Sequence, residues 1–378
     1  MENLNSCCYV ARIGEIVPIP GADNIEVALA GGWQAITKKG DYQVDDLVIV
    51  ATTDAVIPQE LSDAMNVTNY LRKGQRVRTV KLRGVYSECL IIPFKYAREA
   101  ARHANTKWDE GEDMMDLFKI YKYEPPVREV VVSGGRKVKY KDNPLFYVYH
   151  KFPNTKNVPG LFTEEDEVEI SRKIHGTNAR YGVVKKKKIS LWDRVRKFFG
   201  NEWVEYEFVY GSHNVEKGSD SQGYYGTDVW KEVADKYNIK ENLWALFRNY
   251  KELGYVEEGI IIYGEIFGPG IQKNYDYGLT ELKYNGFDVQ IDGEYCDVKG
   301  SFMLQTMLGL DYVPVLYYGK WSQEVQDSFV FNNYIEGTKV PHEGVVIKHI
   351  SGNRHKVAKV INPDYLIYGE KNDVGDSH

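Results

Sequence analysis

The sequence predicts an α+β protein with a small N-terminal β-barrel and a larger C-terminal domain of strands and helices. Short runs that alternate apolar and polar residues, with turn residues between them, follow one another from Tyr9 to about Pro93. A polar, turn-rich stretch at 124–145 separates this region from the rest. Beyond it, strand patterns lie on both sides of a helical pattern at 229–253. We therefore expect a barrel domain at 1–123, a linker at 124–145, a second domain at 146–369 and a C-terminal tail at 370–378.

Bulk composition bounds the class of protein. A chain of 378 residues is long enough for two or three domains with their own cores. Its 43% hydrophobic and 27% charged residues are ordinary for a globular protein, and its net charge of −6 excludes a uniformly basic coat for nucleic acid. No apolar run approaches about 20 residues and no signal-peptide pattern is present, so we expect no membrane segment. The four cysteines lack metal-ligand spacing, which indicates reduced thiols and a cytoplasmic location.

The N-terminal region has the pattern of a small barrel. We expect strands at Val10–Ile16, Ile25–Leu29, Trp33–Ile36 and Leu47–Val50, with turn chemistry between them. Several short strands in this spacing favour an OB-fold. A small barrel of another type, without a ligand, is the alternative.

A basic strand pattern follows in the same region. Between 71 and 83 there are six basic residues and no acid, and Arg76 to Gly84 alternates basic with apolar positions. One face of such a strand is cationic, so we expect Arg76, Arg78 and Lys81 to meet a phosphate backbone.

A second basic segment lies in the larger domain, where ten basic residues between 172 and 200 face the single acid Asp193. Within it, apolar residues at helical spacing over 191–199 predict a short amphipathic helix with bases on the opposite side. Such a helix can lie on a membrane or line a nucleic-acid path. We favour the second interpretation because the helix is short and interrupts a larger domain.

The strongest chemical signal is the stretch Glu169–Gly182. An alternating run ends at Lys173, a turn follows at Gly176, and alternation resumes beyond it. The glycine allows a phosphate to approach the backbone closely, so Lys173 is a candidate nucleophilic amine. A surface lysine in a β-hairpin is the alternative.

Later strands carry further charged residues. Glu265 lies near the end of the apolar run 260–268, where an unpaired carboxylate costs several kcal/mol and therefore marks a candidate site. The strand patterns that follow carry these further candidates: Phe287, Glu343, Lys348, Lys356 and Lys359.

Lys173-Ile174-His175-Gly176 resembles motif I of the covalent nucleotidyltransferases, which include DNA ligases, RNA ligases and capping enzymes. The later strands resemble motifs III, IIIa, IV and V in the same order. The resemblance implies a ligase-type nucleotidyltransferase domain of antiparallel sheets with helices. It also implies that Lys173 is the nucleophile, that Glu265 binds the ribose and that Phe287 stacks on the purine. Glu343 would bind the metal, and the phosphates would be bound by Lys348, Lys356 and Lys359. The nucleotide would also be contacted by Arg172, His175 and Gly176, and the polynucleotide by Asn178 and Arg180.

Three positions depart from the family pattern. His175 replaces an aspartate, so an imidazole stands where the family has the carboxylate that coordinates a metal-bound water. Lys356 and Lys359 are three residues apart rather than two, so they need a bulge or different roles. The stretch Ser212–Asn214 lacks the arginine of motif Ia, for which Arg180 is the candidate substitute.

Domain order indicates the branch of the superfamily. Only 19 residues follow Lys359, and the barrel lies in front, as in the RNA ligases that carry an N-terminal OB domain. The resemblance implies that ATP adenylylates Lys173 with Mg²⁺ or Mn²⁺, that AMP then passes to an RNA 5′-phosphate, and that a 3′-OH displaces AMP. The expected partner is RNA, or an RNA-containing duplex with a nick or break, and the expected state is a monomer. A GTP-using capping-type guanylyltransferase and a non-catalytic nucleic-acid-binding adaptor are the alternatives.

Overall fold

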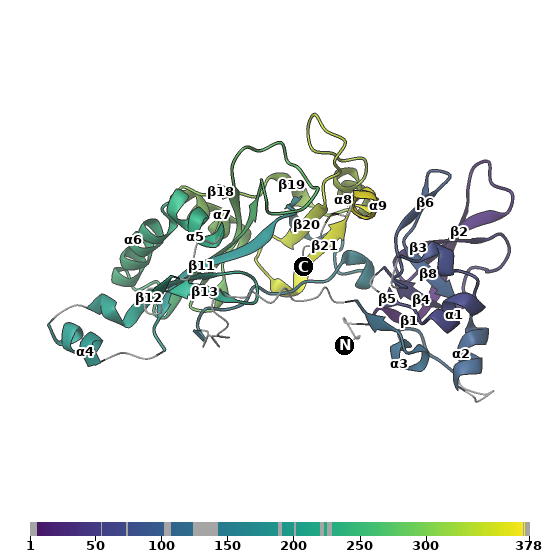
Figure 1. The fold of residues 1–378 in the computed structure, drawn as a ribbon, viewed down its shortest axis with the longest axis horizontal. Helices are drawn as coiled ribbons and strands as arrows, with labels where there is room; N and C mark the ends of the chain where they lie inside the picture. The colour runs from purple at the N-terminus through teal and green to yellow at the C-terminus, as the bar shows by residue number, and fades with distance from the viewer. Residues whose placement is uncertain are drawn as a thin grey trace.

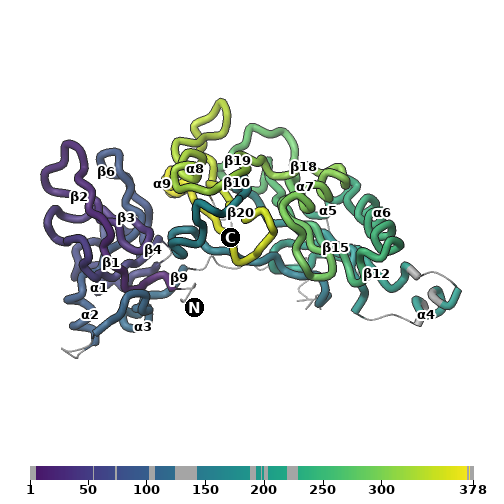
Figure 2. The backbone as a smooth tube through the Cα atoms, turned by 180° about the vertical axis from the view of Figure 1, so that it is seen from behind, coloured from purple at the N-terminus to yellow at the C-terminus, as the bar shows by residue number. Residues whose placement is uncertain are grey.

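The computed structural model shows an elongated molecule with the N-terminal barrel at one end and the larger domain extending away from it (Figures 1 and 2). The structure describes residues 6–53, 55–72, 75–101, 107–123, 143–187, 191–199, 202–219, 223–224, 229–372 and 374. The predicted fold class is confirmed: a β-barrel precedes a domain of antiparallel sheets with helices.

Five strands in the order β3-β2-β1-β4-β8 form the barrel. They are β1 (Cys8–Pro18), β2 (Ile25–Ala30), β3 (Trp33–Lys38), β4 (Leu47–Thr52) and β8 (Cys89–Ile92). The Glu88 N–H donates to the Gln34 carbonyl at 2.8 Å, which joins the two outer strands and nearly closes the barrel. Alternate residues of β1 point into two separate apolar clusters, one around Val10 and one around Ile13, as the period of a strand requires.

Shorter elements complete this domain. The helices are α1 (Gln59–Ala64), α2 (Phe94–Ala101) and α3 (Met115–Phe118), and a two-stranded pair joins β5 (Ala55–Val56) to β9 (Tyr121–Lys122). The basic strand predicted from Arg76 to Gly84 is wrong in its first half. Only Val80–Leu82 is a strand (β6), and it forms a hairpin with β7 (Val85–Ser87) through a turn in which Arg83 has φ 50°.

A four-stranded sheet lies nearest to the barrel in the larger domain, in the order β19-β10-β20-β21. Its strands are β10 (Glu167–Lys173), β19 (Val315–Lys320), β20 (Gly344–His349) and β21 (Val357–Ile361), all antiparallel. One face carries Val168, Ile170, Val345 and Ile347, which pack with residues of α8 (Gln323–Val330). The opposite face carries charged side chains, among them Glu169, Lys173 and Lys348.

The second sheet of this domain has the order β14-β13-β12-β11-β15-β16-β17, with β18 beside β16. The strands are β11 (Thr177–Lys185), β12 (Tyr206–Gly211), β13 (Glu216–Ser219), β14 (Gly223–Tyr224), β15 (Gly259–Phe267), β16 (Lys283–Ile291), β17 (Glu294–Tyr295) and β18 (Asp311–Tyr312). The helices α5 (Val229–Lys236), α6 (Ile239–Glu252) and α7 (Val298–Met307) contribute to the apolar core on one face. The pattern at 229–253 predicted one helix, but Asn238 has φ 50° and breaks it into α5 and α6.

The C-terminal helix α9 (Pro363–Asn372) lies between the two domains (Figure 1). It runs past residue 369, so the tail predicted from 370 begins inside a helix. The predicted linker lies outside the described residues up to 142. Asn143 is buried and donates to Glu207 at 3.0 Å, so the second domain already includes residue 143. No helix of the described chain is long and apolar enough to span a bilayer.

Candidate active site

Three lysines predicted to act together share one face of the four-stranded sheet. In the register of β10, β20 and β21, Lys173 pairs with Gly344, and Glu169 pairs with Lys348. Ser171 pairs with Val346, which pairs with Lys359. Residues directly opposite each other in a sheet point to the same side, and so do alternate residues along a strand. The side chains of Lys173, Lys348 and Lys359 therefore project from a single face.

Lys173 ends β10 and contacts the carboxylate that precedes β20. Its Nζ donates to Glu343 Oε1 at 2.6 Å, and the Glu343 side chain is 4% exposed. The next residue, Gly344, has φ +148°, and a Cβ there would lie 2.0 Å from the Val360 carbonyl oxygen. A glycine is therefore required for β20 to begin this close to β21, and this start places Glu343 beside the lysine.

Gly176 brings the second sheet to the same site. It opens the crossing from β10 to β11, and a Cβ there would lie 2.3 Å from the Ile266 carbonyl oxygen and 2.8 Å from Glu265 Cγ. This close approach to β15 places Glu265 near Lys173. Burial raises the pKa of Glu265 to about 8, and the positive charge of Lys173 opposes the rise.

His175 lies beneath this site in an aromatic cage. Its side chain is fully buried, its Nδ1 is 2.9 Å from the Tyr365 hydroxyl, and its ring contacts those of Tyr275 and Tyr365 edge-on. Its backbone N–H donates to the Tyr277 hydroxyl at 2.7 Å. Nδ1 lies 3.9 Å from Glu343 Oε2, so the histidine also contacts the carboxylate that holds Lys173.

Phe287 and Lys348 lie side by side, on different sheets. Lys348 is 2% exposed, donates to the Phe287 carbonyl at 2.5 Å, and has its Nζ 5.8 Å from the Phe287 ring centroid. It also pairs with Asp288 at 3.0 Å. The structure thus brings Lys173 beside Glu343 and Glu265, and it places Phe287 beside Lys348, which lies further along the same sheet face as Lys173.

A buried charged cluster around Asp288 was not predicted as part of the site. Arg354 pairs with Asp288 at 3.1 Å, and Tyr149 donates to the same carboxylate. Burial opposes ionisation of Asp288, but the charges of Lys348 and Arg354 outweigh it and lower its pKa. The sequence showed Asp288 as an acid in a strand, but nothing in the sequence marks its partners.

Glu169, on the same face of β10 as Lys173, was also missed as a site residue. Burial raises its pKa to about 7, against the opposing effect of Lys348. It stands four residues before Lys173, so strand alternation predicts its face, but alternation does not predict how deeply its carboxyl is buried.

The residues present fit a divalent cation held largely by its nucleotide. Glu343 Oε2 is buried and has no hydrogen-bond partner in the described structure. No group of three or more metal-ligating His, Cys, Asp or Glu side chains occurs among the described residues. Mg²⁺ takes few protein ligands and keeps waters or phosphate oxygens for the rest. Glu343 is therefore the residue that would hold such an ion.

Two predicted site residues have other roles in the structure. Arg180, predicted to contact the polynucleotide, is 1% exposed, donates to the carbonyls of Ser212 and Phe146, and therefore supports the fold. Lys356, predicted to bind phosphate, forms an ion pair with Asp166. Asp166 directly precedes β10, whereas Lys173 ends it, so Lys356 lies at the wrong end of the strand.

Of two other predicted residues, Asn178 lies beside the site and Arg172 lies on the opposite face of β10 from Lys173. Arg172 alternates with Lys173 and points to the other face of β10, where burial lowers its pKa and its Nη1 has no hydrogen-bond partner among described residues. Asn178 pairs with Glu265 in the register of β11 and β15, and its Oδ1 is buried without a described partner.

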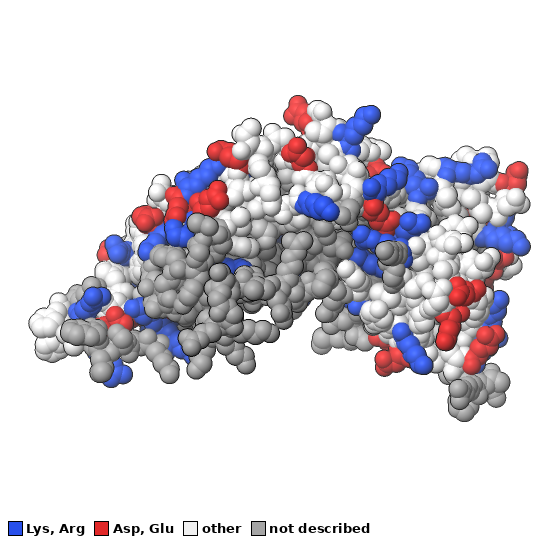
Figure 3. Space-filling model, viewed as in Figure 1, with Lys and Arg blue, Asp and Glu red and all other residues white. Residues whose placement is uncertain are grey.

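The predicted phosphate contacts of the barrel meet protein groups instead. The Arg76 guanidinium lies 4.4 Å over the Tyr123 ring and donates to the Thr53 carbonyl. Arg78 pairs with Glu370 at 3.5 Å and Lys81 with Asp364 at 3.4 Å. Figure 3 shows blue and red side chains together where the barrel adjoins the larger domain.

Comparison with protein families places both halves of the chain. A family model for an OB-fold domain matches residues 7–94, and a family model for RNA ligase matches residues 166–361, just over half of the chain. The barrel prediction of an OB-fold is confirmed by the first match.

Solved structures show the same fold over nearly the whole chain. The RNA ligase of Naegleria gruberi, as a mutant without ligand, gives a TM-score of 0.69 at 22% identity and covers 98% of this chain and 99% of the other. The same enzyme with PPi gives 0.69 at 21% identity, covering 97% and 99%. A mutant of it with ATP and Mn gives 0.68 at 22% identity, covering 96% and 98%.

One curated protein shares a shorter stretch. It is named as an aldehyde dehydrogenase family 7 member A1 homologue from Dictyostelium discoideum, and it is 26% identical over 136 residues. The match covers 33% of this chain, and the chain spans about a quarter (25%) of the length of that relative.

Proposed function

The chain belongs to the RNA ligase family, and we propose that it is an ATP-dependent RNA ligase that joins a 3′-OH to a 5′-phosphate. The observation that carries this proposal is the contact of Lys173 with Glu343 at 2.6 Å in a site that also holds Glu265. Structures of the Naegleria enzyme with ATP and Mn, AMP and Mn, or PPi support ATP as the nucleotide and a divalent cation as its companion. We expect the chain to act as a cytoplasmic monomer.

The first step forms a bond between Lys173 Nζ and the α-phosphorus of ATP. The bond from that phosphorus to the bridging oxygen breaks, and pyrophosphate leaves. The amine must lose a proton before it attacks, since a free lysine has a pKa of about 10.4. Glu343 Oε1 accepts the hydrogen bond from Nζ and holds the amine in place, and the proton passes to water. A bound divalent cation supplies the positive charge that stabilises the phosphate during transfer.

The nucleoside is held by groups from the second sheet. Burial raises the pKa of Glu265 to about 8, and we assign its carboxyl to a hydrogen bond with the ribose hydroxyls. Phe287 is half-buried, and we assign its ring to the purine. We assign Lys359, on the face that carries Lys173, to the phosphates, and buried Lys348 contributes its charge from its ion pair with Asp288.

The later steps need contacts to RNA. AMP passes from Lys173 to an RNA 5′-phosphate, and a 3′-OH then attacks that phosphorus and releases AMP. Asn178 is suited to orient the polynucleotide because it neighbours Glu265 and has an unpartnered amide oxygen in the described structure.

We also assign RNA to the surface around α4 (Leu191–Phe198). Phe198 and Phe199 are 86% and 81% exposed there, and Arg194 and Arg196 are exposed beside them. A neighbouring hollow of about 340 Å³ contains Trp203 and Trp244 together with basic side chains. Exposed aromatic rings between cations suit the stacking of unpaired bases and the binding of their phosphates. This surface lies at the end of the molecule far from the barrel (Figure 1).

Labelled nucleotide tests the proposal. Wild-type protein incubated with α-labelled ATP and a divalent cation is expected to form a covalent adduct, and α-labelled GTP is expected to form none. Lys173→Ala and Lys173→Arg should both abolish the adduct, because arginine stays protonated and cannot attack. Both variants should still join RNA that already carries a 5′-adenylate better than they join RNA with ATP.

Each other outcome selects an alternative. An adduct with GTP alone indicates a guanylyltransferase, and no adduct with either nucleotide indicates a non-catalytic adaptor. Undiminished adduct in Lys173→Ala would show that another residue is the nucleophile.

A further inference from the structure

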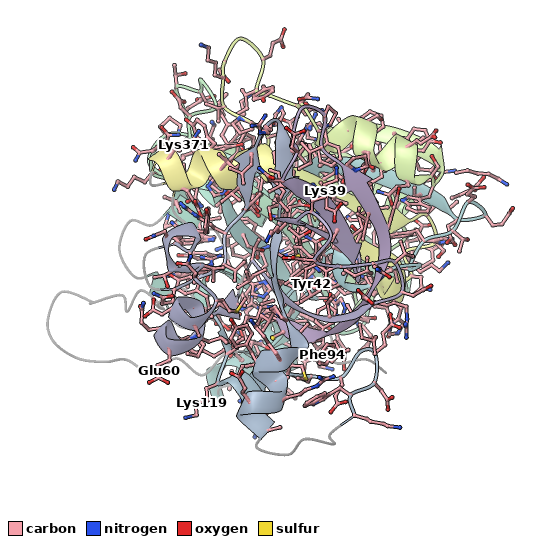
Figure 4. All side chains as sticks on the ribbon, turned by 90° about the vertical axis from the view of Figure 1, so that its right-hand side faces the viewer. Lys39, Tyr42, Glu60, Phe94, Lys119 and Lys371 are labelled. Atoms are coloured by element: carbon pink, nitrogen blue, oxygen red, sulfur yellow. The ribbon has the colours of Figure 1, made fainter. Side chains whose placement is uncertain are left out.

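Helix α9 contacts the barrel on one side and the lysine site on the other. Figure 4 looks at the molecule from the barrel end: Lys39, Tyr42, Glu60, Phe94 and Lys119 belong to the barrel, and α9, which carries Lys371, emerges beside it. The two contacts are made by neighbouring residues of α9, Asp364 and Tyr365.

On the barrel side, Asp364 is the main contact. Its Oδ1 accepts a hydrogen bond from Tyr86 at 2.7 Å and lies 3.4 Å from Lys81 Nζ, and both residues belong to the β6–β7 hairpin. Lys81 also donates to the Tyr86 hydroxyl at 2.9 Å. A second contact joins Glu370, further along α9, to Arg78.

On the other side, Tyr365 is the contact. It is 8% exposed, and its hydroxyl is 2.9 Å from His175 Nδ1. His175 in turn lies 3.9 Å from Glu343 Oε2, and Glu343 Oε1 is 2.6 Å from Lys173 Nζ. A continuous row of contacts therefore leads from the barrel hairpin to the nucleophile.

We propose that α9 couples the docking of the barrel to the assembly of the lysine site. The hairpin holds Asp364, and the adjacent Tyr365 is thereby held against His175. The His175 ring packs 3.9 Å from Glu343 Oε2 and so limits the positions that this carboxylate can take beside Lys173. Asp364 and Tyr365 act as positioning residues, since neither touches the reacting atoms.

The geometry explains why this coupling is strong enough to matter. Of the hydroxyl and amine groups that approach Asp364, those of Tyr86 and Lys81 come from the barrel, and the Tyr334 hydroxyl, at 3.1 Å from Oδ2, comes from the larger domain. Without the barrel groups, the carboxylate at the start of α9 has fewer partners, so this end of the helix is held less firmly. Because Tyr365 follows directly, a shift of a fraction of an ångström lengthens its contact with His175.

The inference rests on the proposed lysyl-AMP step, and its test measures that step in the full chain. Asp364→Ala is expected to slow single-turnover formation of the adduct by about 10- to 150-fold, the effect of removing a hydrogen bond to a charged group. The ATP concentration for half-maximal rate should change little, because the groups that bind the nucleotide remain. Tyr86→Phe combined with Lys81→Ala removes the same interactions from the barrel side and should slow the step equally, which covers the case that Asp364→Ala fails to fold.

A matched control distinguishes coupling through α9 from a general effect of weaker docking between the barrel and the larger domain. Glu88 of the barrel pairs with Lys156 of the larger domain, away from α9. Glu88→Gln therefore weakens domain docking without touching α9, and it should leave the rate of adduct formation near that of wild type. Equal slowing by Glu88→Gln and Asp364→Ala would show that any weakening of docking suffices and would overturn the role of α9.

A double-mutant comparison tests the order of contacts. Tyr365→Phe should slow adduct formation, and adding Asp364→Ala should slow it no further, because both act through one contact. Independent, multiplicative effects would overturn the proposal, as would a wild-type rate in Asp364→Ala. Absence of adduct in the wild-type protein would instead contradict the proposed function.

Discussion

Two basic segments, 72–83 in the barrel and 185–197 around α4, have a similar density of charge and different surroundings. The first holds six basic residues and the second seven. In the barrel, Arg78 and Lys81 face Glu370 and Asp364 of α9. Around α4, Arg194 and Arg196 face solvent beside two exposed phenylalanine rings. A run of bases thus predicts charge but not the partner of that charge.

The ion-pair partners of the basic residues in the barrel segment lie far away in the sequence. Lys81 and Asp364 are 283 positions apart, and Arg78 and Glu370 are 292 apart. A phosphate backbone and a pair of carboxylates are equivalent partners for a cation by charge alone. The distinction between an RNA-binding surface and a domain interface therefore depends on tertiary structure.

Reversing the charges of Arg78 and Lys81 in the barrel segment should have the largest effect on stability and on RNA sealing. Arg78→Glu combined with Lys81→Glu places like charges opposite each other at both contacts. Because Arg78 and Lys81 are about a third exposed, we expect a decrease of about 1–2 kcal/mol in the free energy of unfolding. RNA sealing should slow by about 10-fold or more, because the lysine site loses its support. Thermal unfolding and single-turnover sealing measure the two effects.

Adding Asp364→Lys to this double variant should restore part of the stability and part of the sealing rate. If RNA affinity falls while stability and adduct formation stay at wild-type values, the hairpin is an RNA clamp.

Reversing the α4 charges should have a smaller effect of a different kind. Arg194→Glu combined with Arg196→Glu should weaken RNA binding by about 10-fold or less. It should also reduce the slope of log affinity against log salt by about 0.7–0.9 for each RNA phosphate that the variant no longer binds. Adduct formation and stability should not change, because these side chains are exposed. Lys299→Glu with Lys339→Glu, two exposed lysines outside both segments, is the control. An equal change of slope in that control would show that the effect at α4 comes only from the change in the net charge of the protein.

Lowering the pH should reduce the stability that the barrel segment gains from Asp364 by a few tenths of a kcal/mol. Burial raises the pKa of Asp364, but the hydrogen bonds from Tyr86 and Tyr334 and the charge of Lys81 outweigh it and hold the pKa below its usual range. A lowered carboxyl pKa stabilises the folded state above the ordinary value near 4, and this stability is lost as pH falls through the folded-state pKa. The difference in unfolding temperature between wild type and Asp364→Asn should therefore shrink below about pH 4. A difference that stays constant between pH 7 and pH 3 would mean that this carboxylate is not stabilised by its partners.

Local patterns in the sequence predicted the elements that place the chemistry. Lys173 and Glu265 stand near the ends of strands that the sequence pattern marks, and Glu343 stands directly before a glycine that begins another strand. The structure brings the three together. Strand register then accounts for Lys348 and Lys359 on the same face as Lys173. Alternation and glycine spacing repeat over a few residues, so a sequence displays them, whereas the register between distant strands is set by the fold.

The errors concern side chains whose partners come from elsewhere in the fold. Arg180 alternates correctly in β11, but the carbonyls of Ser212 and Phe146 that surround it belong to other segments. Lys356 is displaced from the phosphate-binding face by a short 3₁₀ turn at Arg354–Lys356. Tyr365 was not predicted because a tyrosine in an amphipathic helix carries no sign of a histidine 190 residues earlier.

The same long separations set an order of events while the protein is made. Lys173 precedes Glu343 by 170 residues, and His175 precedes Tyr365 by 190. At about 5–20 residues per second, a ribosome needs roughly 10–40 s to add the stretch between His175 and Tyr365. Both strands that flank β10, β19 and β20, also follow it by a long interval, so Val168 and Ile170 wait for their partners during synthesis. The nascent chain therefore carries its nucleophile well before the carboxylate and helix that orient it, and a prematurely released chain contains the lysine without an assembled site.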